Sequence, residues 1–216
     1  VVTGLRNSRL PLSKHIADAL LNRMGAVLSV CNCESGRRHF AAKGFKGSKI
    51  EVIPNCFDPI DSYRDREPSD TVNVITVGRF VAQKDYRTAI RAVAEASRRC
   101  PQLRFTVIGY GELEEQVRGW LREEGIEGIT RILINSDRIA DELRQADIYL
   151  STSLFEGISN SIMEGMNADM PVVATSVGDN DVLVKSGVNG YITATGDYMA
   201  IAGHLAELAA DGDRRR

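Results

Sequence analysis

Short apolar runs rich in β-branched residues alternate with helical patterns along almost all of the 216 residues. One such pattern places apolar side chains from Tyr86 to Val93 on a single face and ends before Pro101. Strands that alternate with helices favour a parallel sheet covered by helices on both faces. We therefore predict an α/β fold built on a doubly wound, Rossmann-like parallel sheet. The predicted strands are 1–3, 26–30, 50–53, 72–77, 104–108, 130–134, 148–151, 171–175 and 190–193.

A polar segment with two prolines interrupts this alternation between residues 58 and 70. It has no apolar period, so we interpret residues 59–70 as a linker. Residues 71–216 contain six strand–helix repeats, enough for a complete doubly wound domain. Residues 1–58 contain only three strands and two helices, which predicts part of a second α/β domain. Because the chain begins with Val1 rather than Met, we expect it to start inside a larger protein.

Composition and charge exclude several classes of function. An apolar content of 43% and a charged content of 26% are typical of a globular protein. A net charge of −2 provides no basic surface, so no nucleic-acid partner is predicted. No apolar run is long enough to span a bilayer. The four scattered cysteines are interpreted as reduced thiols, and we expect a cytoplasmic location.

The histidines do not form a metal-binding pattern. His15, His39 and His204 lie far apart, with no cysteine or carboxylate at the spacing of metal ligands. His15 and His204 fall within helical patterns, where surface or hydrogen-bonded positions are expected. We therefore predict no metal site.

Two carboxylates, Glu156 and Glu164, lie eight residues apart across the start of a predicted helix. In one continuous helix they would be about 80° apart around the axis and about 12 Å apart along it. If the helix instead begins near Ser159 or Asn160, Glu156 precedes it and Glu164 lies about one turn inside. The free N–H groups between them then form a site for phosphate. This layout suits a nucleotide diphosphate sugar, which has hydroxyls at both ends and a diphosphate between them.

The alternative for this pair is that two glutamates merely complement the helix dipole. Small residues from Gly157 to Ser161 favour the binding site, because they allow the backbone to approach a ligand closely.

Arg79 and Lys84 follow the predicted strand 72–77 in a loop that begins with Gly78. Ligands of open α/β sheets bind beyond the carboxyl ends of strands, so both cations are placed to meet an anion. Arg can hold a phosphate through two hydrogen bonds, and Lys acts as a mobile point charge. Taken alone, the pair is better explained as two solvated loop charges. Its interpretation as a phosphate site depends on the nearby glutamates.

Gly109 and Gly111 imitate the opening of a dinucleotide-binding fingerprint. The third glycine is replaced by Glu114, whose carboxylate would face a pyrophosphate. We interpret the two glycines as turn geometry near the cleft. A nicotinamide or flavin cofactor is not predicted, and an oxidoreductase is a distant alternative.

Several of these segments resemble, in the same order, the donor half of retaining GT-B glycosyltransferases of family 4. They are Gly78-Arg79 with Lys84, residues 146–153, Glu156 with Glu164, and residues 171–175. Residues 53–58 are similar to the Pro-Asn-Gly-x-Asp segment that closes the N-terminal domain of that family. The resemblance covers residues 45–195.

The resemblance implies a metal-independent transferase that moves a hexose-type sugar from a nucleotide diphosphate to an acceptor with retention. The implied acceptor is a carbohydrate or glycolipid of polysaccharide biosynthesis, and peripheral membrane association of the full-length parent is compatible with this role. No cofactor besides the nucleotide sugar substrate is implied. In the implied roles, Arg79 and Lys84 neutralise the diphosphate, Glu156 holds a sugar hydroxyl and Glu164 binds the ribose. The other implied donor-binding residues are Gly78, Gly157, Ile158, Ser159 and Asn160 at the diphosphate and Ile134 and Asn135 beside the base.

The chain also departs from the family pattern. Cys56 replaces a glycine, Gly165 replaces an alanine after the second glutamate, and Val182 stands where an acidic residue is usual. The front of the N-terminal domain, which contributes to the acceptor site in this family, is missing. We therefore expect the chain to bind the donor but transfer sugar poorly. A GT-B-type sugar-nucleotide epimerase and a non-catalytic nucleotide-sugar-binding module remain alternatives.

Overall fold

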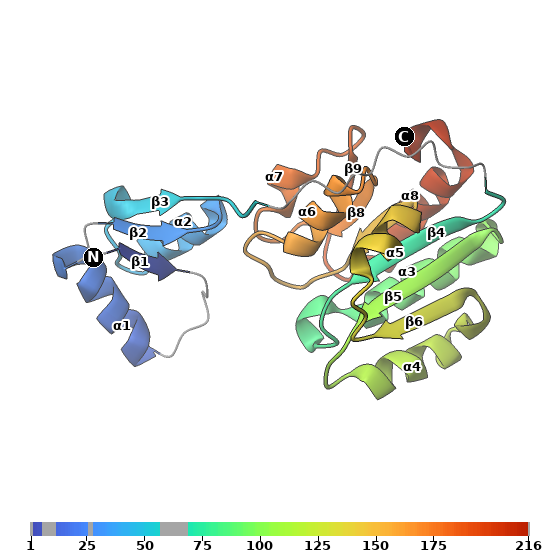
Figure 1. Ribbon diagram of the computed structural model, residues 1–216, viewed down its shortest axis with the longest axis horizontal. Coiled ribbons are helices and arrows are strands. Elements are labelled where there is room, and N and C mark those ends of the chain that lie inside the picture. Colours follow the sequence, from blue (N-terminus) through green and yellow to red (C-terminus); the bar gives the residue numbers. More distant parts are fainter. Residues whose placement is uncertain (1, 6–11, 26–27, 57–68, 216) are drawn as a thin grey trace. The chain divides into compact units, whose positions relative to one another are not determined.

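A computed structural model describes residues 2–5, 12–25, 28–56 and 69–215 (Figure 1). The chain divides into two compact units, Val1–Phe57 and Asp58–Arg216. Predictions that concern residues 57–68, including most of the proposed linker, lie outside the described residues. None of the helices in the described part of the chain is long and apolar enough to cross a bilayer.

The first unit is built on a parallel sheet in the order β1-β2-β3. Buried apolar side chains such as Leu5, Phe40 and Phe45 form its core. The elements are β1 (Val2–Leu5), α1 (Leu12–Leu20), a π-helical turn (Leu21–Gly25), β2 (Leu28–Cys31), α2 (Glu34–Ala42), a 3₁₀ turn (Gly47–Lys49) and β3 (Ile50–Val52).

The second unit is built on a six-stranded parallel sheet in the order β6-β5-β4-β7-β8-β9. The strands are β4 (Val72–Val77), β5 (Leu103–Gly109), β6 (Thr130–Ile134), β7 (Ile148–Ser151), β8 (Val172–Thr175) and β9 (Gly190–Thr193). The helices are α3 (Tyr86–Arg99), α4 (Glu114–Glu123), α5 (Ile139–Gln145), α6 (Asn160–Asn167), α7 (Asn180–Leu183) and α8 (Tyr198–Ala210). Short 3₁₀ turns lie at Ala82–Lys84, Glu127–Ile129 and Asp213–Arg215.

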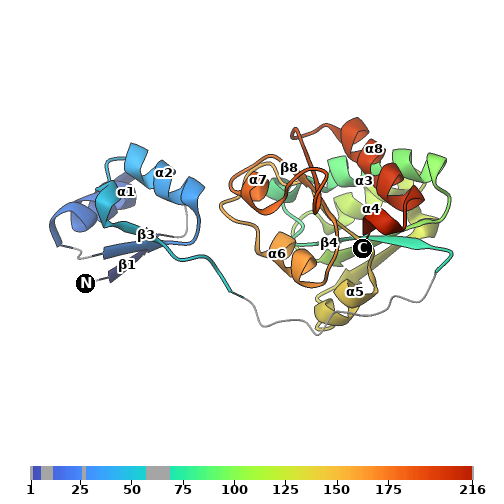
Figure 2. The same cartoon turned by 90° about the horizontal axis from the view of Figure 1, so that it is seen from above.

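Two apolar clusters lie on opposite faces of this sheet, because successive strand side chains point to opposite sides. On β4, Val74 packs with the cluster formed by α3, α4 and α8, and Ile75 packs with the cluster formed by α5 and α6. Figure 2 shows α3 and α8 on one side of the sheet and α5 and α6 on the other. The doubly wound α/β fold that the sequence predicts is therefore present.

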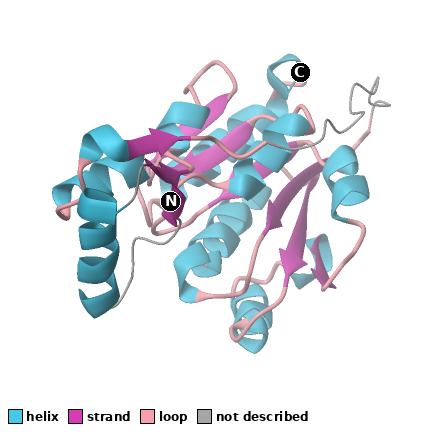
Figure 3. Cartoon of the chain, turned by 60° about the vertical axis from the view of Figure 1, so that its left-hand side comes forward, coloured by secondary structure: helices cyan, strands magenta, loops and turns pink. Residues whose placement is uncertain are grey.

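The strand order reverses between β4 and β7, the two central strands. The first three strands of this unit run outward in one direction and the last three in the other. In a sheet of this kind, the crevice beyond the carboxyl ends of the two central strands is the usual place for a ligand. Figure 3 shows loops connecting the strands to the helices that cover them.

The predicted strand bounds agree with the structure for β4, β6, β7 and β9. The other strands differ at their ends by one or two described residues. β1 and β2 extend to Leu5 and Cys31, because these two buried residues pair in register. β8 begins after Pro171, which has no N–H to donate to a neighbouring strand.

Candidate functional site

The loops that follow β4 and β7 are hydrogen-bonded to each other at the point where the strand order reverses. Gln83 Nε2 donates to the Phe155 carbonyl at 2.8 Å, and Leu154 N donates to the Gln83 carbonyl at 2.8 Å. Thr152 Oγ1 lies 2.9 Å from the carbonyl oxygens of both Lys84 and Asp85. These contacts hold two loops, which are distant in sequence, in one arrangement beyond the carboxyl ends of the strands.

Lys84 and Glu156 meet between these loops. Lys84 Nζ lies 2.7 Å from Glu156 Oε1, and Ser153 Oγ donates to the same oxygen at 2.8 Å. The Lys84 and Glu156 side chains are 21% and 11% exposed, so water screens the ion pair only partly. The sequence prediction placed both residues in one site, and the structure brings them into direct contact.

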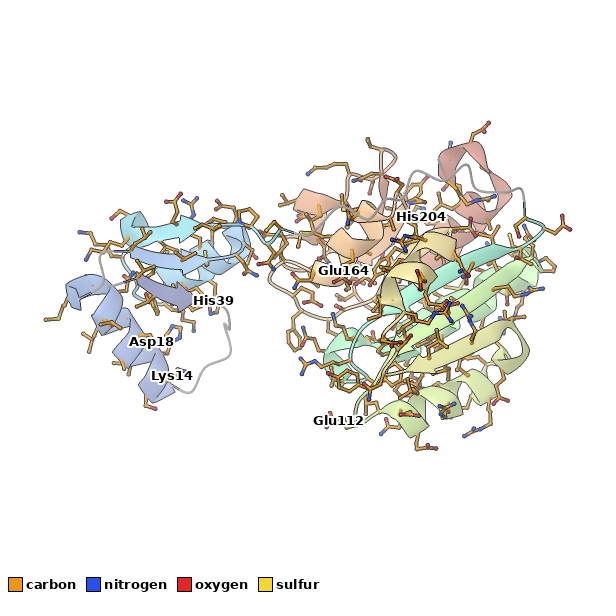
Figure 4. The ribbon with its side chains drawn as sticks, in the orientation of Figure 1. Lys14, Asp18, His39, Glu112, Glu164 and His204 are labelled. Carbon is orange, nitrogen blue, oxygen red and sulfur yellow. The ribbon has the colours of Figure 1, made fainter. Side chains whose placement is uncertain are left out.

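Helix α6 begins at Asn160, with Ser159 as its N-cap; the cap hydroxyl accepts from Ile162 N at 3.4 Å. Glu156 therefore precedes the helix, and Glu164 lies about one turn inside it (Figure 4). The sequence predicted this arrangement from the cap residues. Ser159 is buried, Ile158 is half-buried, and Gly157 and Asn160 are exposed at the positive end of the helix dipole.

Glu164 is half-buried, and burial raises the pKa of its carboxyl group above its usual value, while the charge of Lys84 lowers it less. Glu156 and Glu164 thus lie on either side of the start of α6, with Lys84 paired to Glu156.

The remaining predicted site residues lie along the same sheet edge. Gly78 follows β4, and the exposed Arg79 next to it makes no ion pair with any described residue. Its guanidinium is therefore not neutralised within the described part of the chain. Ile134 ends β6 with 37% of its surface exposed, and Asn135 follows in a left-handed conformation with φ +49°. One strand, β5, lies between β6 and β4.

Close backbone contacts explain the glycines of this edge. A Cβ on Gly109 would lie 1.9 Å from the Gly78 carbonyl oxygen, and one on Gly111 would lie 2.6 Å from the Phe80 carbonyl oxygen. These glycines therefore form turn geometry that packs one loop against another, as the sequence predicted. Gly178, with φ +59°, is similarly pressed against the carbonyl oxygens of Glu156 and Gly157.

Sequence reasoning did not identify the polar residues that support Glu156. Ser153 and Thr175 are fully buried; Ser153 follows β7, and Thr175 ends the neighbouring strand β8. Thr175 Oγ1 donates to the Ser153 carbonyl at 2.6 Å. The signal that could have found them is the polar run from Ser151 to Ser153, directly after a buried apolar strand.

The prediction for His15 was wrong. Its side chain is buried against Phe40 and Phe45 in the first unit, and its Nε2 has no hydrogen-bond partner among the described residues. The helical pattern located the residue on α1 but could not show that this face packs on two aromatic rings. No group of three or more His, Cys, Asp or Glu side chains is placed to hold a metal ion within the described residues.

A cavity of about 750 Å³ lies at the opposite edge of the six-stranded sheet. Its lining includes Thr71, Arg104, Thr130 and Asp147, which lie at or near the amino ends of the strands. Three arginines contribute to it, but Arg131 and Arg144 pair with Glu142 and Asp141. Because their charges are already compensated, the cavity is a weaker candidate than the carboxyl edge.

Comparison with known proteins identifies the family of the second unit. The family model described as "Glycosyl transferases group 1" matches residues 60–216. The lipopolysaccharide core biosynthesis glycosyltransferase LpsE of Rhizobium meliloti is 27% identical over 191 residues, covering 86% of this chain and 55% of LpsE. The amylovoran biosynthesis glycosyltransferase AmsK of Erwinia amylovora is 28% identical over 146 residues, covering 64% of this chain and 36% of AmsK. The chain thus spans about half or less of these two relatives.

Solved structures show the same fold. The crystal structure of Anabaena HepE in complex with UDP and glucose has a TM-score of 0.86 and 24% sequence identity, covering 99% of this chain and 63% of HepE. The crystal structure of a Staphylococcus aureus TarM mutant, in complex with ligands that include UDP, has a TM-score of 0.84 at 18% identity and covers 95% of this chain and 41% of TarM. The family match over residues 60–216, together with the GT-B-type parallel sheets, shows that the chain belongs to the group 1 glycosyl transferases.

Proposed function

We propose that the chain is the donor-binding part of a retaining, family 4 type transferase that uses a nucleotide diphosphate sugar. The observation that carries this proposal is the 2.7 Å contact between Lys84 and Glu156 beside the start of α6. A cation, an acid and the first N–H groups of a helix meet there at the point where the strand order reverses. In this assignment residues 71–216 bind the donor, residues 59–70 are a linker, and residues 1–58 belong to the acceptor-side domain.

The site can stabilise the leaving group without a metal ion. The diphosphate gains negative charge as the bond to the sugar breaks, and preorganised cations and N–H groups stabilise that charge. Lys84, the exposed Arg79 and the amides of residues 158–160 are the groups assigned to it. Glu156 accepts a hydroxyl of the sugar, and Glu164, one turn into α6, accepts the hydroxyls of the ribose. Ile134 and Asn135 lie beside the base in this assignment.

The relatives support a nucleotide sugar as the ligand. HepE has been crystallised in complex with UDP-glucose, and LpsE is a lipopolysaccharide core biosynthesis glycosyltransferase. By analogy we assign a hexose-type donor and a carbohydrate or glycolipid acceptor to the full-length protein, acting in the cytoplasm or at the inner face of the membrane. No cofactor beyond the sugar nucleotide is assigned. The 216-residue chain itself should bind donor and transfer poorly.

Isothermal titration of the chain with UDP, GDP and ADP tests this proposal. We expect one of the three to bind with a Kd between about 1 μM and 1 mM. The variants Arg79→Ala and Glu164→Ala should each weaken that nucleotide about tenfold, because each removes one charged contact. Absence of binding by all three nucleotides, or unchanged affinity in the double variant, would contradict the assigned site.

Retention and metal independence need the full-length parent. The anomeric configuration of the transferred sugar, read by proton NMR, should match that of the donor. The initial rate should be unchanged by an excess of EDTA. An inverted product, or loss of rate that Mg²⁺ restores, would contradict the retaining, metal-independent mechanism.

A further inference from the structure

A chain of buried polar groups lies behind the Lys84–Glu156 pair and links the ends of β7 and β8 to α7. Ser153 Oγ donates to Glu156 Oε1 at 2.8 Å, and Thr175 Oγ1 donates to the Ser153 carbonyl at 2.6 Å. Asn180 Nδ2 donates in turn to the Thr175 carbonyl at 3.0 Å. Ser153, Thr175 and Asn180 are all 0% exposed, so none of them can contact a ligand. Ser153 is the one of the three that contacts Glu156, so an effect of its hydroxyl on ligand binding is expected to pass through Glu156.

The contacts of Glu156 are unevenly divided between its two carboxylate oxygens. Lys84 Nζ and Ser153 Oγ both contact Oε1, at 2.7 and 2.8 Å. Oε2 makes no hydrogen bond or ion pair with the residues that the structure describes. An ionised carboxylate accepts hydrogen bonds through both oxygens. Oε2 is therefore the atom left to accept a hydroxyl from a ligand.

Lys84 and Ser153 differ in what happens to their contacts when a polyanion arrives. The ammonium group of Lys84 is a point charge on a flexible stem, and a diphosphate competes with Glu156 for it. Ser153 is buried, and Thr175 of β8 holds its backbone through the Ser153 carbonyl. A hydrogen bond from a hydroxyl to an ionised carboxylate is among the stronger ones in proteins. When Lys84 turns toward a diphosphate, the bond from Ser153 remains.

From these contacts we infer that Ser153, supported by Thr175, is a positioning residue for the donor sugar. It keeps Glu156 Oε2 directed at a sugar hydroxyl while Lys84 contacts the diphosphate. This inference rests on the proposed function and adds a residue that does not touch the substrate. The inference predicts different effects on the two parts of the donor. Loss of the Ser153 hydroxyl weakens binding of the sugar and leaves binding of the nucleotide unchanged.

Calorimetric titration of the 216-residue chain with UDP and with UDP-glucose tests whether Ser153 affects binding of the sugar alone. If another nucleoside diphosphate is preferred, that nucleotide and its glucose conjugate take their place. In Ser153→Ala, the Kd for UDP should stay within about twofold, whereas that for UDP-glucose should rise about five- to tenfold, since a hydrogen bond to a charged group is lost. Ser97→Ala is the matched control, because Ser97 Oγ donates to the Ala94 carbonyl within α3. It should change neither Kd.

A double-mutant cycle distinguishes positioning from a general structural effect. In a Glu156→Gln background, Ser153→Ala should cause no further loss of UDP-glucose affinity, because its effect passes through Glu156. Equal weakening of UDP and UDP-glucose, an unchanged Kd for both, or a penalty that persists beside Glu156→Gln would overturn the inference while the proposed function stands. Absence of nucleotide binding by the unmodified chain would instead overturn the proposed function, and the inference with it.

Discussion

At the scale of single residues, the proposed site contains a carboxyl group, that of Glu164, whose burial lowers the stability of the folded chain at neutral pH. Glu164 is half-buried, and the burial of its carboxyl group raises its pKa despite the opposing effect of Lys84. A carboxyl group with a raised pKa makes the folded protein less stable at a pH where the group must ionise. Such a cost is expected where a side chain is kept for binding rather than for folding.

Glu164→Gln should therefore stabilise the free chain at neutral pH. The folded state holds the Glu164 proton more tightly than the unfolded chain does, so this stability contribution is complete at low pH. It is lost as the pH rises through the folded-state pKa. Urea denaturation should show a free energy of unfolding roughly 0.5 to 1 kcal/mol above that of the unmodified chain at pH 7. The difference should shrink toward pH 4.

Glu112→Gln is the control for this prediction, because Glu112 is an exposed loop residue (Figure 4). It should alter the free energy of unfolding by less than about 0.5 kcal/mol over the same pH range. A Glu164→Gln variant that is less stable at pH 7 would show that Lys84 stabilises the carboxylate more than burial destabilises it.

The residue types of the site were predictable from the sequence, but their contacts were not. Glu156, Lys84 and the cap at Ser159 follow from strand ends and helix-start chemistry. The pairing of Lys84 with Glu156 joins residues 72 positions apart, and no periodicity in the chain encodes it. Ser153 was missed for a related reason, because its importance depends on which carboxylate oxygen it contacts.

At the scale of elements, one departure from the family pattern has a packing explanation. Gly165 lies on α6 where the family usually has alanine, and α6 packs on β7. A Cβ at this position would lie 2.6 Å from Cγ of Tyr149, a buried side chain of β7. The large ring on the strand therefore requires the small residue on the helix.

Gly165→Ala should destabilise the chain by about 1–3 kcal/mol, because the added methyl group overpacks this contact. The matched control is Gly203→Ala on α8, where a Cβ would meet nothing within 4 Å. That variant should stabilise the chain by about 0.5–1 kcal/mol, since alanine is the better helix former. Thermal unfolding measures both. A Gly165→Ala variant as stable as the unmodified chain would refute the packing explanation.

Element order and most strand bounds were predictable, because a parallel sheet with helices on both faces produces continuous apolar runs separated by periodic ones. The order of the strands in the sheet could not be predicted from the sequence. Nothing in the chain alone states that β7 rather than β6 pairs with β4. That order places the loops after β4 and β7 together, so the location of the site depended on the fold.

At the scale of the whole molecule, the chain divides into two compact units, and the proposed donor site belongs to the second. The residues assigned to the donor lie between Gly78 and Glu164, all within the second unit. This unit has apolar clusters on both faces of its sheet. Among the described residues it also contains six strands, against three in the first unit.

Residues 69–216 expressed alone should therefore fold and bind the preferred nucleotide with a Kd within about twofold of that of the whole chain. A larger domain buries a greater share of its surface, and here the second unit is the larger one. Circular dichroism and calorimetry test the two parts of this prediction. A folded fragment with no nucleotide affinity would place an essential binding group in residues 1–68.

The measurement that tests the site most directly is an NMR titration of the ¹⁵N-labelled chain with the preferred nucleoside diphosphate. The amides that shift most should belong to residues 78–84 and 157–161, at the carboxyl ends of β4 and β7. Shifts concentrated instead at Thr71, Arg104, Thr130 and Asp147 would place the ligand in the cavity at the opposite edge of the sheet. That result would contradict the assignment of Lys84, Glu156 and Glu164 to the donor.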